Sequence, residues 1–256
     1  MKKLIKNIFN TFGFEIRRKQ NEREINYLTF DKIYRKIIKN DKPIIFDIGA
    51  NKGQSIDRFL KIYKNSLIHS FEPLPKEFNY LKKKYNNYDN ISLVNLAVGK
   101  EKTKKTLNIA GHSGNSSFFE IKKDSDWLNL RSEQLGINKE NYITKKIEVN
   151  LDTVDSYCNT NSINNINIMK IDTQLYEQQV LMGCENMIKN QKIDAIEIEI
   201  VFSSVYEKYV NFSDIEKYLL PYNYRFSGIE LHNNSLFGGS IFFADILFLN
   251  KSKFNL

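Results

Sequence analysis

Near its start the chain reads Pro43-Ile-Ile-Phe-Asp-Ile-Gly-Ala-Asn-Lys-Gly53, an apolar run that stops at Asp47 and passes into a turn with two glycines. A strand buried inside a parallel sheet ends in this way. Apolar side chains follow at Ile56, Phe59 and Tyr63, the spacing of a helix that lies on a sheet. The stretch therefore predicts a strand, a turn and a helix in succession.

The alternation of strand-like and helical runs continues along the chain. It predicts an α/β fold with a mostly parallel sheet and right-handed crossovers, closed by an antiparallel hairpin. A late helix should begin at the capping-box pattern Ser213 to Glu216. Further strands are expected at Ser66–Glu72, Ile91–Val98, Ile166–Asp172, Ile193–Ile200, Tyr224–Leu231 and Ile241–Leu249, with helices from Pro75 and from Tyr176 to Ile188.

The pattern divides the chain into three parts. Residues 1–40 are expected to form a basic helical extension and residues 41–256 one domain, since 256 residues are near the upper limit of a single core. Between about 100 and 151 short alternating pieces at 105–109, 117–121 and 143–149 predict a β-rich insertion beside the sheet. The small-residue loop from Ala110 to Ser117 is long enough to be functional.

The composition is that of a globular protein, with 41% hydrophobic and 27% charged residues. It excludes a disordered chain, collagen and a disulfide scaffold. The 38 Lys and Arg exceed the 30 Asp and Glu by 8, and a basic surface attracts anionic ligands, nucleic acid included. The two cysteines, Cys158 and Cys184, are expected to be free thiols in a cytoplasmic protein.

The first residues carry basic side chains but neither an unbroken apolar core nor a small-residue cleavage site, so we expect no signal peptide. Apolar residues from Leu4 to Phe12 recur at helical spacing and predict a short amphipathic helix. This helix either packs on the domain or makes a peripheral contact with a membrane surface. No segment is long enough to span a bilayer. The sequence leaves the oligomeric state open, a homo-oligomer included.

Polar residues gather where the predicted strands end, which is where open α/β sheets bind ligands. With Gly49 as the first glycine of a dinucleotide motif, Asn51 and Gln54 stand where the other two glycines belong, and the pattern of a phosphate loop is also missing. Glu72 lies 72 − 47 = 25 residues after Asp47, a spacing that suits an acid accepting hydrogen bonds from two ribose hydroxyls. These features predict an adenosine ligand with a zwitterionic end, and S-adenosylmethionine fits that description.

A set of motifs occurs in a fixed order from about residue 40 to the end. The motifs are Phe46-Asp-Ile-Gly-Ala-Asn-Lys-Gly-Gln54, Ser70-Phe-Glu-Pro73, Asn95-Leu-Ala-Val-Gly99, Gly114 to Ser117, Val149-Asn-Leu-Asp-Thr-Val-Asp155, Met169-Lys-Ile-Asp172 and Ala244-Asp-Ile-Leu-Phe248. Together they resemble the FkbM family of methyltransferases. The resemblance implies the Rossmann-like class I methyltransferase fold, a seven-stranded sheet with helices on both faces. It also implies methyl transfer from S-adenosylmethionine, with S-adenosylhomocysteine as product, to a hydroxyl of a sugar or natural product.

The resemblance further implies which residues hold the cofactor. Asp47, Gly49, Asn51 and Gly53 would hold the methionine end, Glu72 the ribose, and Asn95 with Ala97 the adenine. Neighbours in the same motifs complete the expected set: Ala50, Gln54, Ser55, Pro73, Val98 and Asp172.

The chain departs from the family at the end of the fourth predicted strand. The usual run there is Lys-Ile-Asp-Val-Glu-Gly, whereas this chain has Gln174 in place of the acid and Leu175 in place of the glycine. If that acid helps to remove a proton or to bind a metal in the family, this chain must use another group for that role or act on another acceptor. The departure bears on the chemistry more than on the cofactor site.

A hydroxyl is a poor nucleophile, so methyl transfer to it calls for a base within hydrogen-bond reach. The candidates are Asp172, His112, His232 and Glu199. His112 and His232 stand in loops, where an exposed histidine without function is an equally good interpretation. Glu197 and Glu199 share one side of a strand, and acids inside a sheet need partners, so one of them is expected to be functional.

The histidines and cysteines do not have the spacing of a zinc site, so no metal ligands are predicted. A magnesium ion centred on Asp172 stays open as an alternative, disfavoured by the missing acid at position 174.

Three functions follow, in order of preference. The first is an O-methyltransferase that modifies a sugar hydroxyl in a nucleotide-sugar or a surface-glycan precursor, of capsule or lipopolysaccharide, with the basic charge favouring an anionic acceptor. The second is a non-catalytic or altered-specificity binding protein of the same fold, motivated by Gln174 and Leu175. The third is a nucleic-acid methyltransferase, for which no basic module interleaved with aromatic residues is found, so we expect no nucleic-acid partner.

Overall fold

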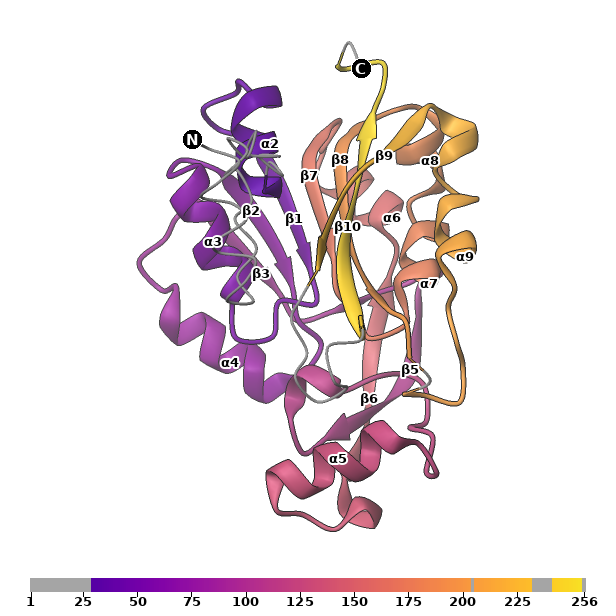
Figure 1. Ribbon diagram of the computed structural model, residues 1–256. Helices are drawn as coiled ribbons and strands as arrows, with labels where there is room; N and C mark the ends of the chain where they lie inside the picture. The colour runs from indigo at the N-terminus through magenta and orange to yellow at the C-terminus, as the bar shows by residue number, and fades with distance from the viewer. Residues whose placement is uncertain (1–28, 204, 232–240, 255–256) are drawn as a thin grey trace, which may run out of the picture.

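The computed structural model describes residues 29–203, 205–231 and 241–254. Its centre is a seven-stranded sheet in the order β3-β2-β1-β7-β8-β10-β9 (Figure 1). The strands are β1 (Ile44–Ile48), β2 (Leu67–Phe71), β3 (Ile91–Val94), β7 (Ile166–Ile171), β8 (Ile193–Val201), β9 (Tyr224–Leu231) and β10 (Phe243–Asn250). β10 runs antiparallel to both β8 and β9, whereas the first five strands in this order are parallel. The predicted sheet and its antiparallel end are confirmed.

Helices cover both faces of this sheet because its central strands are apolar on both sides. Ile45, Ile168, Ala195 and Leu247 pack in one cluster with side chains of α2 (Phe30–Ile37), α3 (Gln54–Ile62) and α4 (Pro75–Lys84). The next residue along each of these strands belongs to the other cluster, with α6 (Val154–Thr160), α7 (Glu177–Met182), α8 (Glu185–Lys189) and α9 (Phe212–Glu216). Figure 1 shows these two groups of helices on opposite sides of the sheet.

The run Ile91–Val98, expected to be one strand, is split between two sheets. β3 ends at Val94, and β4 (Ala97–Val98) pairs with β6 (Ile143–Asp152), which also pairs with β5 (Thr103–Ala110). The break lies at Asn95, whose amide donates to the carbonyl oxygens of Glu72 (2.9 Å) and Pro73 (3.1 Å). These side-chain bonds turn the backbone out of the main sheet, so the expectation of a single strand was wrong.

The insertion holds fewer strands than expected and one helix that the pattern did not predict. Residues 117–121 make two isolated bridges, Asn108 with Ser117 and Ile121 with Tyr206, rather than a strand. α5 (Asp126–Leu135) follows, and its first turn is capped by Ser125, whose hydroxyl accepts from Leu128 N–H. Short 3₁₀ turns occur at Ser113–Asn115, Lys139–Asn141 and Leu220–Tyr222.

Two helical expectations near the end of the chain also need correction. The stretch from Tyr176 to Ile188 forms two short helices, because the Asp155 carboxylate accepts from Asn186 N–H (2.8 Å) and Met187 N–H (3.1 Å) and so starts α8 anew. The capping box of α9 is formed by Asn211 and Asp214, not by Ser213, which lies inside the helix.

Part of the predicted N-terminal extension belongs to the core of the domain. Phe30 and Tyr34 of α2 are buried against the sheet, and Tyr34 donates from its hydroxyl to Glu197 Oε2 at 2.7 Å. The helix expected between Leu4 and Phe12 lies outside the described residues. Over the described ranges, none of the helices has the length and apolar character needed to cross a membrane.

Candidate cofactor and active site

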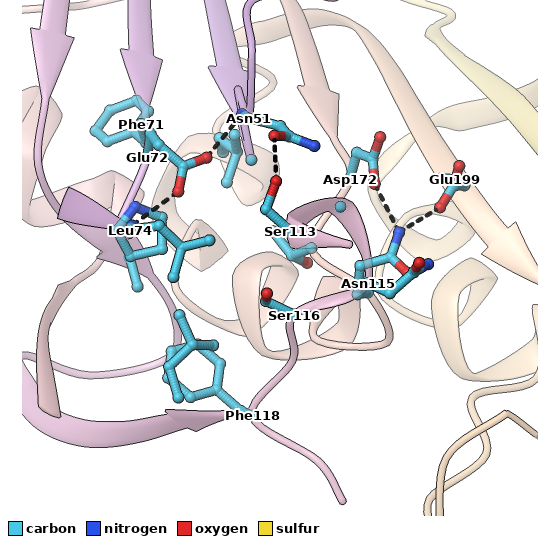
Figure 2. Close-up of a pocket in the computed structure, with 18 of the residues that line it drawn as sticks. Asn51, Phe71, Glu72, Leu74, Ser113, Asn115, Ser116, Phe118, Asp172 and Glu199 are labelled. Carbon is cyan, nitrogen blue, oxygen red and sulfur yellow. Dashed lines mark hydrogen bonds between the residues drawn. The ribbon is translucent and has the colours of Figure 1, made fainter. Parts of the chain in front are cut away.

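A cavity of about 280 Å³ lies at the carboxyl ends of the parallel strands. The chain passes from β1 towards β2 and β3 on one side and returns to β7 on the other, and such a reversal leaves a crevice between β1 and β7. Side chains from both edges of the crevice line the cavity, and the loop 113–116 closes it from the insertion (Figure 2). The fold therefore places the predicted strand ends in one site.

The turn after β1 brings the backbone close to β7. Gly49 has φ +94° and Gly53 has φ +82°, and Asn51 between them also has a positive φ of 47°. A Cβ on Gly49 would lie 1.9 Å from the carbonyl oxygen of Asp172. The turn therefore needs glycine at position 49 for both its backbone conformation and its space.

This double requirement gives a stability prediction for Gly49→Ala. We expect the free energy of unfolding to fall by roughly 2 kcal/mol or more, because the positive φ and the contact with Asp172 both penalise a side chain. Gly136→Ala is the matched control, because Gly136 also has a positive φ (+63°) but has nothing within 4 Å of its would-be Cβ. Urea unfolding of the two variants measures the difference, and equal losses would contradict the crowding of Gly49.

Glu72 forms the polar floor of the cavity at the end of β2. One carboxylate oxygen accepts from Asn51 N–H at 2.7 Å and the other from Leu74 N–H at 2.8 Å. These bonds fix the carboxylate towards the cavity, as Figure 2 shows. Burial raises the pKa of Glu72 to about 7 against the lowering effect of the two backbone donors.

A second group of polar side chains lies across the cavity, at the ends of β7 and β8. The Gln174 side-chain amide donates to Asp172 Oδ1 (3.1 Å) and to Glu199 Oε2 (2.8 Å), so one neutral side chain bridges two acids (Figure 2). Lys170 Nζ lies 3.1 Å from the other oxygen of Asp172. The Tyr206 hydroxyl lies 3.3 Å from Gln174 Oε1, which orients the amide with its NH₂ towards the acids.

The two acids of this group differ in their surroundings. The pKa of Glu199 is raised well above its ordinary value by burial first and then by the negative charge of Asp172, while Lys170 opposes the shift. Glu199 Oε1 accepts no hydrogen bond from any described residue and belongs to the cavity wall. Such a carboxylate combines a raised pKa with a vacant acceptor, as a general base requires.

The loop that carries Gln174 has an unusual backbone. Gln174 (φ 53°) and Leu175 (φ 72°) are two consecutive non-glycine residues in the left-handed region. Ser117 holds the first with a bond from its hydroxyl to Gln174 O (2.7 Å), and Glu177 accepts from Leu175 N–H (3.2 Å). Burial of Leu175 and these bonds retain a conformation that is costly for side chains with a Cβ.

Glu197 points to the same side of β8 as Glu199 but has a structural role. It is fully buried, and its carboxylate accepts from two Arg58 nitrogens at 2.6 and 2.9 Å and from Tyr34. Every polar atom of this acid is thus engaged between the sheet, α2 and α3. Of the two glutamates, Glu199 is the one that reaches the cavity.

The cavity brings together eight of the predicted cofactor-binding and catalytic residues: Gly49, Asn51, Glu72, Pro73, Ala97, Val98, Asp172 and Glu199. Six others lie beside or beneath it without lining it: Asp47, Ala50, Gly53, Gln54, Ser55 and Asn95. Asp47 is buried under the turn, where Ser70 donates to it at 3.2 Å and burial raises its pKa to about 6. His112 lines a different cavity, and His232 lies outside the described residues.

Several cavity residues were not assigned a role from the sequence. The loop residues Ser113, Asn115 and Ser116 line it, and Ser113 donates from its hydroxyl to Asn51 Oδ1 at 3.2 Å. The richness of this loop in small polar residues was the signal, but no pattern tells which strand end a loop will cover. Phe118, Phe242 and Phe243 add apolar walls.

Potential metal ligands are not clustered in the described part of the chain. Across 29–203, 205–231 and 241–254, no three His, Cys, Asp or Glu side chains are arranged to hold an ion. Cys158 and Cys184 are both buried and not disulfide-bonded.

Comparisons with known proteins extend this picture. The family model described as "Methyltransferase FkbM domain" matches residues 47–226, more than half of the chain. The 2-O-methyltransferase NoeI of Sinorhizobium fredii (strain NBRC 101917 / NGR234) is 20% identical over 157 residues, which cover 59% of this chain and 63% of that protein. The match thus spans less than two thirds of that relative's length.

Solved structures with a related arrangement are distant in sequence. One is M. capricolum TrmK in complex with S-adenosyl-homocysteine, 12% identical, with a TM-score of 0.46 over 87% of this chain and 68% of that one. Another is precorrin-6y C5,15-methyltransferase from Geobacter metallireducens GS-15, 9% identical, with a TM-score of 0.41 over 89% and 90%. The family match over residues 47–226 confirms the resemblance found in the motifs: the chain belongs to the FkbM family of S-adenosylmethionine-dependent methyltransferases.

Proposed function

We propose that this chain transfers a methyl group from S-adenosylmethionine to a hydroxyl of a sugar, in a nucleotide-sugar or a surface-glycan precursor. The family match supports methyl transfer, and the name of the S. fredii relative supports oxygen as the acceptor atom. One structural observation carries the proposal. A single cavity joins Glu72 and the Gly49 turn on one wall to Glu199 on the other (Figure 2).

The first wall fits an adenosine cofactor. Glu72 keeps its carboxylate in place with two backbone donors, which leaves further lone pairs of its oxygens for two ribose hydroxyls. The glycine at position 49 lets the turn pack against the Asp172 backbone at the edge of the cavity, and Leu96, Ala97 and Val98 offer an apolar wall for the adenine. When bound, S-adenosylmethionine supplies an electrophilic methyl group.

The second wall provides a base for the acceptor. Methyl transfer to oxygen is an in-line displacement, so most of the rate comes from holding the hydroxyl in line with the methyl group. Glu199 accepts the proton of that hydroxyl on its unoccupied oxygen, while Gln174 holds the other oxygen. Asp172, paired with Lys170, orients ligands from the neighbouring strand end.

Isothermal titration with S-adenosylmethionine and S-adenosylhomocysteine is the first test of this function. We expect both to bind, and no binding by either would contradict the proposal. Incubation with labelled S-adenosylmethionine and a panel of nucleotide sugars and oligosaccharides then tests turnover, with label appearing in the acceptor.

A second candidate function is a binding protein that keeps the fold and the cofactor site but does not methylate sugars. Gln174 and Leu175 favour it, because a neutral bridge stands where the family has an acid and a buried leucine holds a backbone conformation suited to glycine. Cofactor binding without turnover over a broad panel would support this candidate, and turnover on any acceptor would eliminate it.

The bridge of Gln174 leads to a pH prediction. Gln174→Glu puts a third negative charge between Asp172 and Glu199, which raises the pKa of Glu199 further. Because the base must be deprotonated to act, the acid limb of the pH profile of kcat/KM should move to higher pH, by roughly one unit or more.

The matched control is Gln178→Glu, the same change one turn along, where the Gln178 amide lies 3.4 Å from the Tyr218 hydroxyl outside the cavity. Its acid limb should coincide with that of the unchanged protein. An unshifted limb in Gln174→Glu would show that Glu199 is not the base.

A further inference from the structure

A second cavity of about 680 Å³ lies between α4 and the three-stranded sheet of the insertion. Its walls come from the start of α4, from Lys52 in the turn after β1, from the end of β5 and the loop that follows it (109–113), and from β6. A volume of this size holds a ligand of two or three rings. Nothing in the proposed chemistry uses this groove, yet its position beside the cofactor cavity calls for an explanation.

The two cavities share part of their walls. Leu74 and Ser113 line both of them. Ser113 also donates to Asn51, so the partition consists of side chains of the cofactor turn and of the small-residue loop. A ligand in the groove therefore lies next to the cofactor site rather than on an unrelated face.

The groove is lined by positively charged side chains. Lys52, Lys76 and Lys145 line it, and none of them forms an ion pair with a described residue. Other surface lysines do find carboxylates, for example Lys104 with Glu148 (3.1 Å). Among the described lining residues Glu77 is the one acid, and it is buried in the wall. Unpaired lysines around one concave surface attract an anion.

Other groups in the groove are suited to a carbohydrate. The Tyr80 ring, 49% exposed, stands at the groove with apolar neighbours Ile109 and Ile147, which suits stacking against a sugar ring. His112 offers a ring nitrogen, and its pKa is lowered by partial burial and by the positive charges of Arg131 and Lys52, so at neutral pH it is an uncharged hydrogen-bonding group.

We propose that this groove binds the anionic part of the acceptor, a saccharide that carries phosphate or carboxylate groups, while the hydroxyl to be methylated reaches past Ser113 into the cofactor cavity. The inference rests on the proposed methyltransferase function and names its substrate class. The lysines supply the charge, Tyr80 the stacking surface and His112 a polar contact. Phosphate of a nucleotide sugar and carboxylate of an acidic glycan are the two sources of this charge.

The test uses the full chain saturated with S-adenosylhomocysteine and the double variant Lys76→Glu/Lys145→Glu. Titrations are made with UDP, inorganic pyrophosphate, a hyaluronan tetrasaccharide and neutral maltotetraose. We expect at least one anionic probe to bind the unchanged protein, with an affinity that falls as salt rises, and the double variant to bind it at least about tenfold more weakly, since four units of charge change in the groove. UDP and the tetrasaccharide distinguish a nucleotide-sugar from an acidic glycan.

The control is the double variant Lys82→Glu/Lys83→Glu, which makes the same four-unit charge change on α4 but at residues that do not line the groove. It should bind the anionic probes as the unchanged protein does. Thermal unfolding and the affinity for S-adenosylhomocysteine show that each variant is folded, and both should be unchanged because Lys76 and Lys145 lie outside the cofactor cavity.

Three results would overturn the inference. They are the absence of binding by every anionic probe at millimolar concentration, equal binding to the double variant, and tighter binding of a single-stranded RNA oligonucleotide than of any saccharide. A failure of the proposed function is seen separately in the same experiment, because it would be the failure of S-adenosylhomocysteine itself to bind.

Discussion

Replacing Glu199 by glutamine should lower kcat by roughly 10²- to 10⁴-fold, the range expected for loss of a general base. The substitution keeps the shape of the side chain, and its carbonyl oxygen can still accept from Gln174, so the cavity is preserved. The affinity for S-adenosylhomocysteine should therefore change little. Initial rates on an acceptor identified in the panel of saccharides measure kcat. Calorimetric titration with S-adenosylhomocysteine measures the affinity.

The same substitution should also remove the acid limb from the pH profile. In the unchanged protein, activity should rise with pH through a value well above the ordinary pKa of a glutamate, because burial and Asp172 disfavour the charged form. If the Glu199→Gln protein keeps most of its kcat, another residue removes the proton. Asp172→Asn is then the variant to compare.

The second large effect is expected for Glu72→Gln, which should weaken S-adenosylhomocysteine binding on the order of 100-fold. Hydrogen bonds from two ribose hydroxyls to a charged carboxylate contribute about 1.5–3 kcal/mol each, and the amide would also turn an N–H group towards one of the backbone donors of Asn51 and Leu74. Calorimetric titration at pH 8 measures the loss.

Binding to the unchanged protein should depend on pH in a defined direction. The pKa of Glu72 is raised to about 7, so the carboxylate is ionised above pH 7 and protonated below it. Affinity should therefore fall as the pH drops through about 7, and Glu72→Gln should lose this dependence. Glu77→Gln, at a nearby buried acid outside the cofactor cavity, is the control and should keep the affinity at pH 8. Because the charge of Glu77 contributes to the raised pKa of Glu72, the midpoint of the pH dependence should move to lower pH in this variant but not disappear.

The elements of the main sheet could be predicted because each depends on local pattern. The apolar run before Asp47 and the glycines after it mark a strand end wherever they occur, and the structure has β1 and the turn there. The breaks at Asn95 and before α8 could not be predicted, because they arise from bonds to residues distant in the sequence. Asn95 binds the carbonyl oxygens of Glu72 and Pro73, and Asp155 caps α8.

The candidate site divides in the same way. Alternation along β8 gives Glu197 and Glu199 the same side, and no local pattern separates them. Arg58 of α3 and Tyr34 of α2 donate hydrogen bonds to Glu197, whereas Glu199 accepts from Gln174 at the cavity. His112 shows the same limit of local pattern, because its loop places Ser113 beside the turn after β1 and the histidine in the neighbouring groove.

The split of the run Ile91–Val98 makes cofactor binding depend on the small sheet of the insertion. Ala97 and Val98 line the cofactor cavity and, as β4, are paired with Leu151 and Asp152 of the small sheet. Whatever the adenine gains from this wall depends on the wall being held there by β6. Local opening of the small sheet and loss of cofactor are therefore thermodynamically linked, and a substitution that weakens the pairing of β4 with β6 should also weaken cofactor binding.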